Sequence, residues 1–97
     1  MGRVEAFSIA GLDLWFPSSD HLPPHFHARR PGEWEVRVFF LLCTGTHLEV
    51  SVKWRDRKRS IGRKHLEALR GAAVQFREQL LQEWEVKVDS GELDDEG

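Results

Sequence analysis

The stretch that decides the fold spans residues 25–38 and reads HFHARRPGEWEVRV. Its two halves alternate between apolar and polar side chains, and alternating residues of a strand point to opposite faces of a sheet. Residues 30–32 between them, Arg-Pro-Gly, are typical of a three-residue hairpin loop that ends in glycine. The stretch therefore predicts a β-hairpin with one apolar face. The residues expected on that face are Phe26, Ala28, Trp34, Val36 and Val38.

The length of this loop also predicts the register of the hairpin, because an odd loop places even-numbered residues opposite one another. The pairs expected on the apolar face are Ala28 with Trp34 and Phe26 with Val36, and those on the polar face are His27 with Glu35, His25 with Arg37, and Arg29 with Glu33. The polar face gathers imidazole, carboxylate and guanidinium groups. It is therefore the candidate functional face.

Shorter alternating runs on both sides extend this hairpin into an antiparallel meander. Residues 4–16 predict two short strands joined by a turn at residues 10–11, and we expect the strand after the hairpin loop to run from Glu35 to about Leu42. After a turn at residues 44–46, Val50, Val52 and Trp54 alternate with polar residues in a further strand. The chain thus predicts a sheet of about five strands.

The hydrophobic period changes after residue 60. Apolar residues then recur mostly at steps of three and four, which is typical of a helix with one buried stripe. The stripe comprises Ile61, Leu66, Leu69, Ala73, Phe76, Leu80 and Trp84. Ser60 is a favourable N-cap, so we expect one long helix over about residues 61–83, packed on one face of the sheet, and a short final strand over residues 84–88. The predicted class is α+β, with one domain at residues 1–88 and a disordered acidic tail at residues 89–97.

The composition of the chain indicates the compartment in which the protein works. Hydrophobic residues make up 40% of the chain and charged residues 31%, values typical of a folded soluble protein. Cys43 is the only cysteine, which excludes an intrachain disulfide and is typical of a reducing compartment. The start of the chain lacks the apolar core of a signal peptide, and no apolar run approaches the roughly 20 residues that a bilayer span requires. We therefore expect a cytoplasmic protein without a membrane partner.

The net charge of −2 conceals two segments of opposite sign. Residues 53–64, here named the basic segment, contain one acidic residue and seven basic ones, and residues 89–97 contain five acids and no base. The basic residues are Lys53, Arg55, Arg57, Lys58, Arg59, Arg63 and Lys64. Three interpretations stay open: the segment binds nucleic acid or another polyanion, it docks an acidic protein partner, or it is a solvated loop that pairs with the acidic tail. Trp54 beside Arg55 would add a stacking surface for nucleic acid.

Histidines are concentrated just before the hairpin, in the run DHLPPHFH at residues 20–27. His25 and His27 are two residues apart, so on a strand they point to the same face and can converge on one ligand. With His21 as a third imidazole and a carboxylate from Asp20 or Glu35, they resemble the ligand sets of zinc and non-haem iron. Two other interpretations stay open: hydrogen bonds that stabilise the Pro-Pro corner, and acid–base catalysis.

The run at residues 20–27 follows a short aromatic strand pair and precedes a Glu-aromatic-Glu strand. In this it resembles a small bacterial family known as domain of unknown function 4160. The segment LLQEW at residues 80–84 is similar to that family's helix end, which commonly reads Leu-x-x-x-Trp. The stretch at residues 54–60 departs from the family, whose second hairpin is usually acidic or neutral and whose helix usually begins after Gly-x-Leu-Pro.

The resemblance implies a function class but no reaction, because that family has no established activity. Its members are often encoded beside another small domain of unknown function, an arrangement suggestive of toxin–antitoxin or regulatory pairs. We therefore expect a cytoplasmic binding or regulatory module of that kind rather than an enzyme. The alternative is a small metal-dependent hydrolase or nuclease centred on His21, His25 and His27, with zinc or iron as the cofactor.

Overall fold

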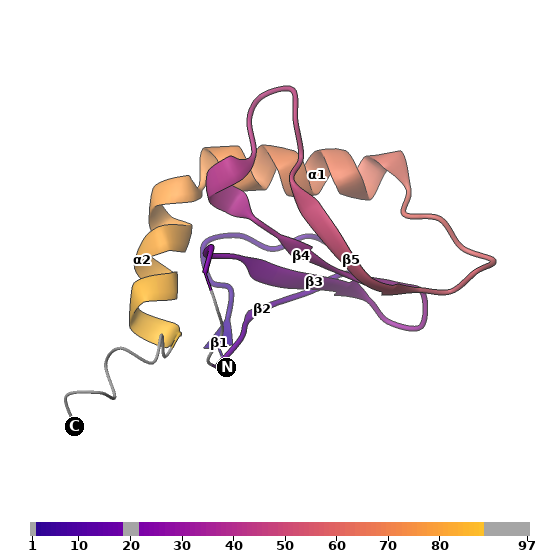
Figure 1. Cartoon of the computed structure of the whole chain (residues 1–97), viewed down its shortest axis with the longest axis horizontal. Helices are drawn as coiled ribbons and strands as arrows, with labels where there is room; N and C mark the ends of the chain where they lie inside the picture. Colours follow the sequence, from indigo (N-terminus) through magenta and orange to yellow (C-terminus); the bar gives the residue numbers. More distant parts are fainter. Residues whose placement is uncertain (1, 19–21, 89–97) are drawn as a thin grey trace.

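The five strands of the sheet lie side by side in the order in which they occur along the chain. They are β1 (Gly2–Arg3), β2 (Asp13–Phe16), β3 (Phe26–Arg30), β4 (Trp34–Val38) and β5 (Val50–Arg55). Every neighbouring pair is antiparallel, so the predicted meander is confirmed (Figure 1). The two strands expected within residues 4–16 are correct only for β2, because the first strand, β1, lies before residue 4. This computed structural model describes residues 2–18 and 22–88. The acidic tail expected at residues 89–97 lies outside them.

Turn chemistry, rather than loop length alone, decides the register of the central hairpin. The loop is residues 31–33, because the Glu33 N–H donates to the Arg30 carbonyl at 2.9 Å and closes a turn around Pro31 and Gly32. Gly32 has φ +80°, which suits the third position of a type II turn that carries proline at the second. The observed pairs are Arg30 with Trp34, Arg29 with Glu35, Ala28 with Val36, His27 with Arg37, and Phe26 with Val38.

The predicted pairs in this hairpin are therefore wrong by two residues. A shift of two leaves every side chain on its predicted face, whereas a shift of one would reverse the faces. Phe26, Ala28 and Val36 are accordingly all completely buried in the core.

Strand β4 ends earlier than the alternation predicts. It stops at Val38, and residues 40–42 form the short 3₁₀-helix η1 (Phe40–Leu42). Phe40 is fully buried, but Leu42 is half exposed and does not continue the apolar face. The apolar run up to Leu42 is thus divided between a strand and a turn of helix.

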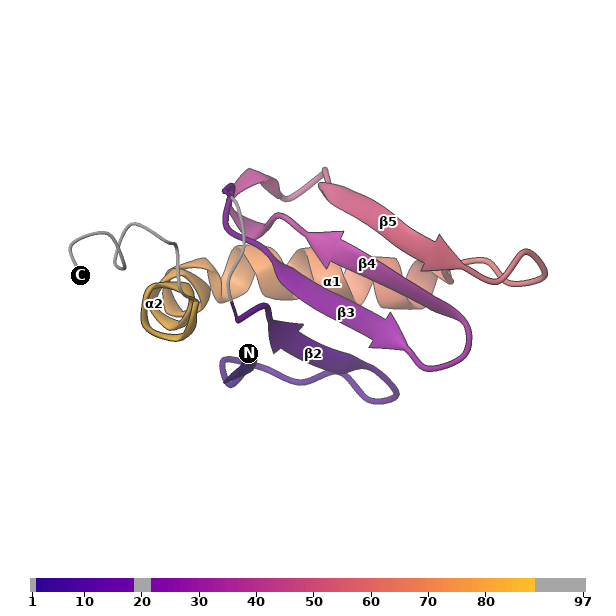
Figure 2. The ribbon, with the colours of Figure 1, turned by 60° about the horizontal axis from the view of Figure 1, so that its bottom comes forward.

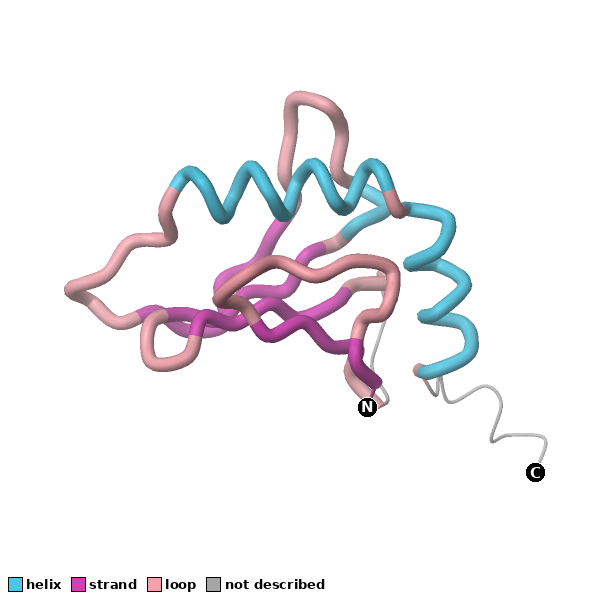
Figure 3. Tube along the Cα trace, turned by 180° about the vertical axis from the view of Figure 1, so that it is seen from behind, coloured by secondary structure: helices cyan, strands magenta, loops and turns pink. Residues whose placement is uncertain are grey.

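Two helices follow the sheet instead of the single one predicted. Helix α1 (Arg63–Gln75) lies along one face of the sheet, and α2 (Arg77–Lys87) turns sharply away and lies across the end of the sheet (Figures 1 and 3). Phe76 separates them with φ −106° and ψ 22°. The final strand expected at residues 84–88 is wrong, because Trp84 belongs to α2 and only Val88 at its C-cap is extended.

The break at Phe76 lets the apolar stripe follow the corner of the core. Members of the stripe are buried on both sides of it: Leu69, Ala73, Leu80 and Trp84. A straight helix over residues 63–87 would be roughly 37 Å long at about 1.5 Å per residue, whereas a five-residue strand spans roughly 17 Å. A straight helix would therefore carry Leu80 and Trp84 past the sheet. At the corner itself, Phe76 stacks on Phe7 with ring centroids 5.6 Å apart.

Candidate functional site

Helix α1 covers one face of the sheet, and the other face carries the candidate site. In Figure 2 the strands lie in front of α1, so this second face, here named the open face, is turned toward the viewer. The strand register places on it the side chains of Asp13, Trp15, His27, Arg29, Glu35, Arg37, Ser51, Lys53 and Trp54. Most of these side chains are polar or aromatic, as the alternation predicts.

Glu35 forms the centre of the open face. It is only 6% exposed, yet three side chains from two other strands reach its carboxylate. Oε2 lies 3.3 Å from Nδ1 of His27 and 3.5 Å from Nζ of Lys53, and Oε1 accepts a hydrogen bond from Nε1 of Trp54 at 3.2 Å. Burial by itself would raise the pKa of Glu35, but the Trp54 hydrogen bond and the Lys53 charge outweigh burial and lower it. The carboxylate is therefore ionised.

The His27 ring packs against two other aromatic rings. Trp15, its partner across strands β2 and β3, stacks on it with ring centroids 5.2 Å apart and an interplanar angle of 11°. His25 meets it edge-on at 5.3 Å. Burial, followed by the neighbouring His25, lowers the pKa of His27 despite the opposing influence of Glu35. The neutral ring consequently donates its Nδ1–H to the carboxylate of Glu35.

A β-bulge places Trp54 on this face. Val36 pairs with Val52 whereas Glu35 pairs with Trp54, so Lys53 is an extra residue in β5. Simple alternation predicts Trp54 on the apolar face, and that prediction is wrong because the bulge reverses its side. The indole is 39% exposed while its N–H is held by Glu35.

His25 occupies a different position from the one that the hairpin predicts. It precedes β3 and packs against Trp84 of α2 and against Phe39, with ring centroids 5.6 Å and 5.3 Å away. Its Nδ1 lies 3.0 Å from the carbonyl oxygen of Pro23. His25 therefore joins the histidine run to the end of the sheet where α2 crosses it.

The proposed metal ligands are brought together only in part. His25 and His27 are neighbours and Glu35 contacts His27, whereas Asp20 and His21 lie outside the described residues. Within the described ranges, no group of three or more His, Cys, Asp and Glu side chains could hold a metal ion.

The basic segment connects the end of β5 to the first turn of α1 and forms a loop that projects at one end of the molecule (Figures 1 and 2). Lys53 pairs with Glu35, and Arg55 donates to the carbonyl of Arg59 at 2.7 Å. The remaining five cations are exposed and form no ion pair with a carboxylate of the described residues: Arg57, Lys58, Arg59, Arg63 and Lys64. The pairing expected with the acidic tail lies outside the described part of the chain.

The start of α1 adds to this positive surface. Its N-cap is Gly62 rather than the predicted Ser60, and neither a side-chain cap nor an acidic residue is present in its first turn. The first N–H groups of a helix and its dipole attract anions. The sequence identified the cations of this region correctly but misplaced the cap by two residues.

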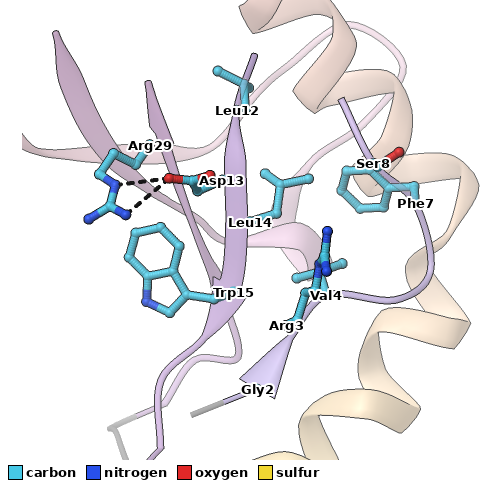
Figure 4. A pocket seen from close by; sticks show the side chains of 10 residues that line it. All are labelled: Gly2, Arg3, Val4, Phe7, Ser8, Leu12, Asp13, Leu14, Trp15 and Arg29. Atoms are coloured by element: carbon cyan, nitrogen blue, oxygen red, sulfur yellow. Dashed lines mark hydrogen bonds and ion pairs between the residues drawn. The ribbon is translucent and has the colours of Figure 1, made fainter. Parts of the chain in front are cut away.

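A pocket of about 470 Å³ opens beside β1 and β2, at the β1 edge of the sheet (Figure 4). Its walls come from residues 2–8 and from β2, and Arg29 closes one side. Arg29 donates to Asp13 at 3.0 Å and lies 5.0 Å from the ring centroid of Trp15, so the pocket borders the open face. No local pattern predicts this pocket, because its walls join the N-terminal segment to two separate strands.

Comparison with known proteins identifies no family for this chain. No family model, no curated protein and no solved structure matches the chain. Among the helices of the described residues, none combines the length and the apolar character needed to cross a bilayer.

The lowered pKa of His27 predicts a loss of stability in mild acid. As the pH falls below about 6.5, His27 becomes protonated in the unfolded chain while it is still neutral in the folded chain. Unfolding therefore becomes more favourable. We expect His27→Gln to lose less unfolding free energy than the wild type between pH 7 and pH 5, as measured by urea denaturation.

A matched control for this experiment is His47→Gln, which changes an exposed histidine and should retain the wild-type dependence. If His27→Gln and the wild type followed the same pH profile, His27 would not be the group whose burial resists protonation.

Proposed function

We propose that this chain is a small binding module that recognises nucleic acid through the basic segment. The observation that carries the proposal is a group of five exposed cations at the start of α1 that form no ion pair with a carboxylate of the described residues. Arg63 interacts electrostatically with Glu67 without such an ion pair. Lys and Arg side chains in such a group neutralise phosphates and release the counterions condensed on the nucleic acid. The net charge of the whole chain is −2, so the attraction is local to this surface.

The position of the segment supports a continuous binding surface. Arg57, Lys58 and Arg59 belong to the loop, while Arg63 and Lys64 begin α1 directly after it. Lys53 and Trp54 at the other end of the segment lie on the open face. A ligand on the loop can therefore extend onto the sheet without crossing the helix.

The resemblance to the family named above supports a regulatory setting for this binding. A cytoplasmic module that works beside a second small protein, as in toxin–antitoxin pairs, would combine a nucleic-acid surface with a partner surface. An acidic protein is the competing occupant of the basic segment, and the experiment below distinguishes the two.

The triple variant Arg57→Ala/Lys58→Ala/Arg59→Ala tests the proposal. Fluorescence anisotropy with labelled DNA and RNA should show wild-type affinity falling with salt, and the variant should flatten the log–log slope by about 2 to 3, since each lost phosphate contact contributes about 0.7–0.9. The weakening should be similar for all nucleotide sequences. Arg3→Ala removes an exposed cation at the opposite edge of the sheet and should change the slope by less than about one.

Two results would contradict the proposal. One is a wild-type protein that retains neither DNA nor RNA at low ionic strength. The other is a protein that binds polyglutamate but no nucleic acid under the same conditions, which would assign the segment to an acidic protein partner.

A divalent-metal site, serving a small hydrolase or nuclease, is the second candidate. The observation in its favour is that Nδ1 of His25 and Nδ1 of His27 each face an oxygen, the carbonyl of Pro23 and the carboxylate of Glu35. Donation of Nδ1–H to such an oxygen leaves the lone pair on Nε2, the arrangement that orients histidine ligands in metal sites. Asp20 or His21 would have to complete the ligand set.

Elemental analysis of the untagged protein tests this candidate. A metal enzyme should contain about one zinc or iron per chain, lose it in His25→Ala, and melt at a lower temperature after chelation. His47→Ala, at an exposed histidine, should keep the metal. Absence of stoichiometric metal, together with an unchanged melting temperature on addition of zinc, nickel or iron, would exclude it.

A further inference from the structure

Trp54 is the most exposed aromatic side chain on the open face. Trp34 and Trp84 are buried in the core, and Trp15 is half buried against His27. Trp54 is 39% exposed, and its indole N–H is fixed by the buried carboxylate of Glu35. An accessible ring in a fixed orientation loses little conformational entropy when a planar group stacks on it.

The β-bulge is responsible for this position. Because Lys53 is the extra residue, both Lys53 and Trp54 contact Glu35 from the same side of β5. Without the bulge, alternation would turn Trp54 toward the face that α1 covers. Bulges are frequent beside functional sites, where they re-aim a side chain in this way.

Cations lie on both sides of the indole. Lys53 has a half-exposed side chain on the open face, and Arg37 in the neighbouring strand β4 forms no ion pair with a described residue. On the other side, the chain continues from Trp54 through the rest of the basic segment, residues 55–64. In the strand register, Arg37 thus lies on one side of Trp54 along the open face, and the rest of the basic segment follows on the other side.

We infer that the nucleic acid bound by this protein is single-stranded, with an unpaired base stacked on Trp54 and its phosphates contacted by Lys53, Arg37 and the basic segment. A duplex keeps its bases stacked on one another and offers the indole only base edges and phosphates, whereas a single strand offers the π-face of a base. The inference rests on the proposed nucleic-acid function and specifies its substrate class.

The test compares a labelled 15-nucleotide single strand with a duplex of the same length by fluorescence anisotropy. The wild type should bind the single strand more tightly. Trp54→Ala should weaken single-strand binding about tenfold, the size expected for one lost base–aromatic stack, and should change duplex binding by less than about twofold. Val86→Ala, at an apolar residue of α2 that is 83% exposed, should leave both affinities unchanged.

A second measurement covers the case in which Trp54→Ala fails to fold. Trp54→Phe keeps an aromatic ring, so it should retain most of the single-strand affinity. Unlabelled single-stranded DNA should quench the tryptophan fluorescence of the wild type, and part of this quenching should come from Trp54. Trp54→Phe should lose that part. Quenching equal to that of the wild type would overturn the inference.

The failure of this inference differs from the failure of the proposed function. If Trp54→Ala binds single strands as tightly as the wild type while the basic-segment variant binds weakly, stacking on Trp54 is wrong and the proposed function stands. Tighter wild-type binding to the duplex would likewise overturn the single-strand preference alone. If the wild type binds neither nucleic acid at low salt, both proposals fall.

Discussion

The open face depends on the buried carboxylate of Glu35. An ionised group that is 6% exposed loses most of its hydration, and it is tolerated only where charges and hydrogen bonds replace the lost water. Here His27 of β3 and both Lys53 and Trp54 of β5 supply that replacement. One side chain of the interior strand β4 therefore connects β3 and β5, the strands on either side of it.

This constraint separates structural charges from charges that are available for binding. His27 is engaged with Glu35 and Arg29 with Asp13, whereas Lys53 contacts Glu35 through a side chain that remains 47% exposed. The cations at residues 57–64 have no comparable partner among the described residues, so their electrostatic potential is directed at solvent. Trp54 has both a structural and an accessible part. Its N–H donates to Glu35, while its ring remains accessible to a ligand. The network thereby fixes the place where the sheet and the basic segment meet.

Elements that depend on local pattern could be predicted from the sequence, and those that depend on tertiary contacts could not. Alternation gave the correct faces of β3 and β4, but the turn at Pro31 and Gly32 moved the register by two residues. The apolar stripe included the buried helical residues Leu69, Ala73, Leu80 and Trp84 but missed Ala72. The break at Phe76 follows from the limited length of the sheet.

The candidate site shows the same division. The charge run alone marks the basic segment, since charge can be read directly from composition. The bulge that turns Trp54 to the open face has no local signature, because neither glycine nor proline is present in β5. The contact between His27 and Glu35 was predicted as a direct cross-strand pair and is present as a diagonal one.

A double-mutant cycle between positions 35 and 54 measures how strongly Glu35 holds Trp54 in place. Urea denaturation would give the unfolding free energies of the wild type, Glu35→Ala, Trp54→Phe and the double variant. A hydrogen bond to a buried carboxylate predicts an interaction energy of about 1–3 kcal/mol between the two positions. If the effects of the two substitutions add within about 0.5 kcal/mol, the two side chains are energetically independent, and Glu35 does not hold Trp54 in place.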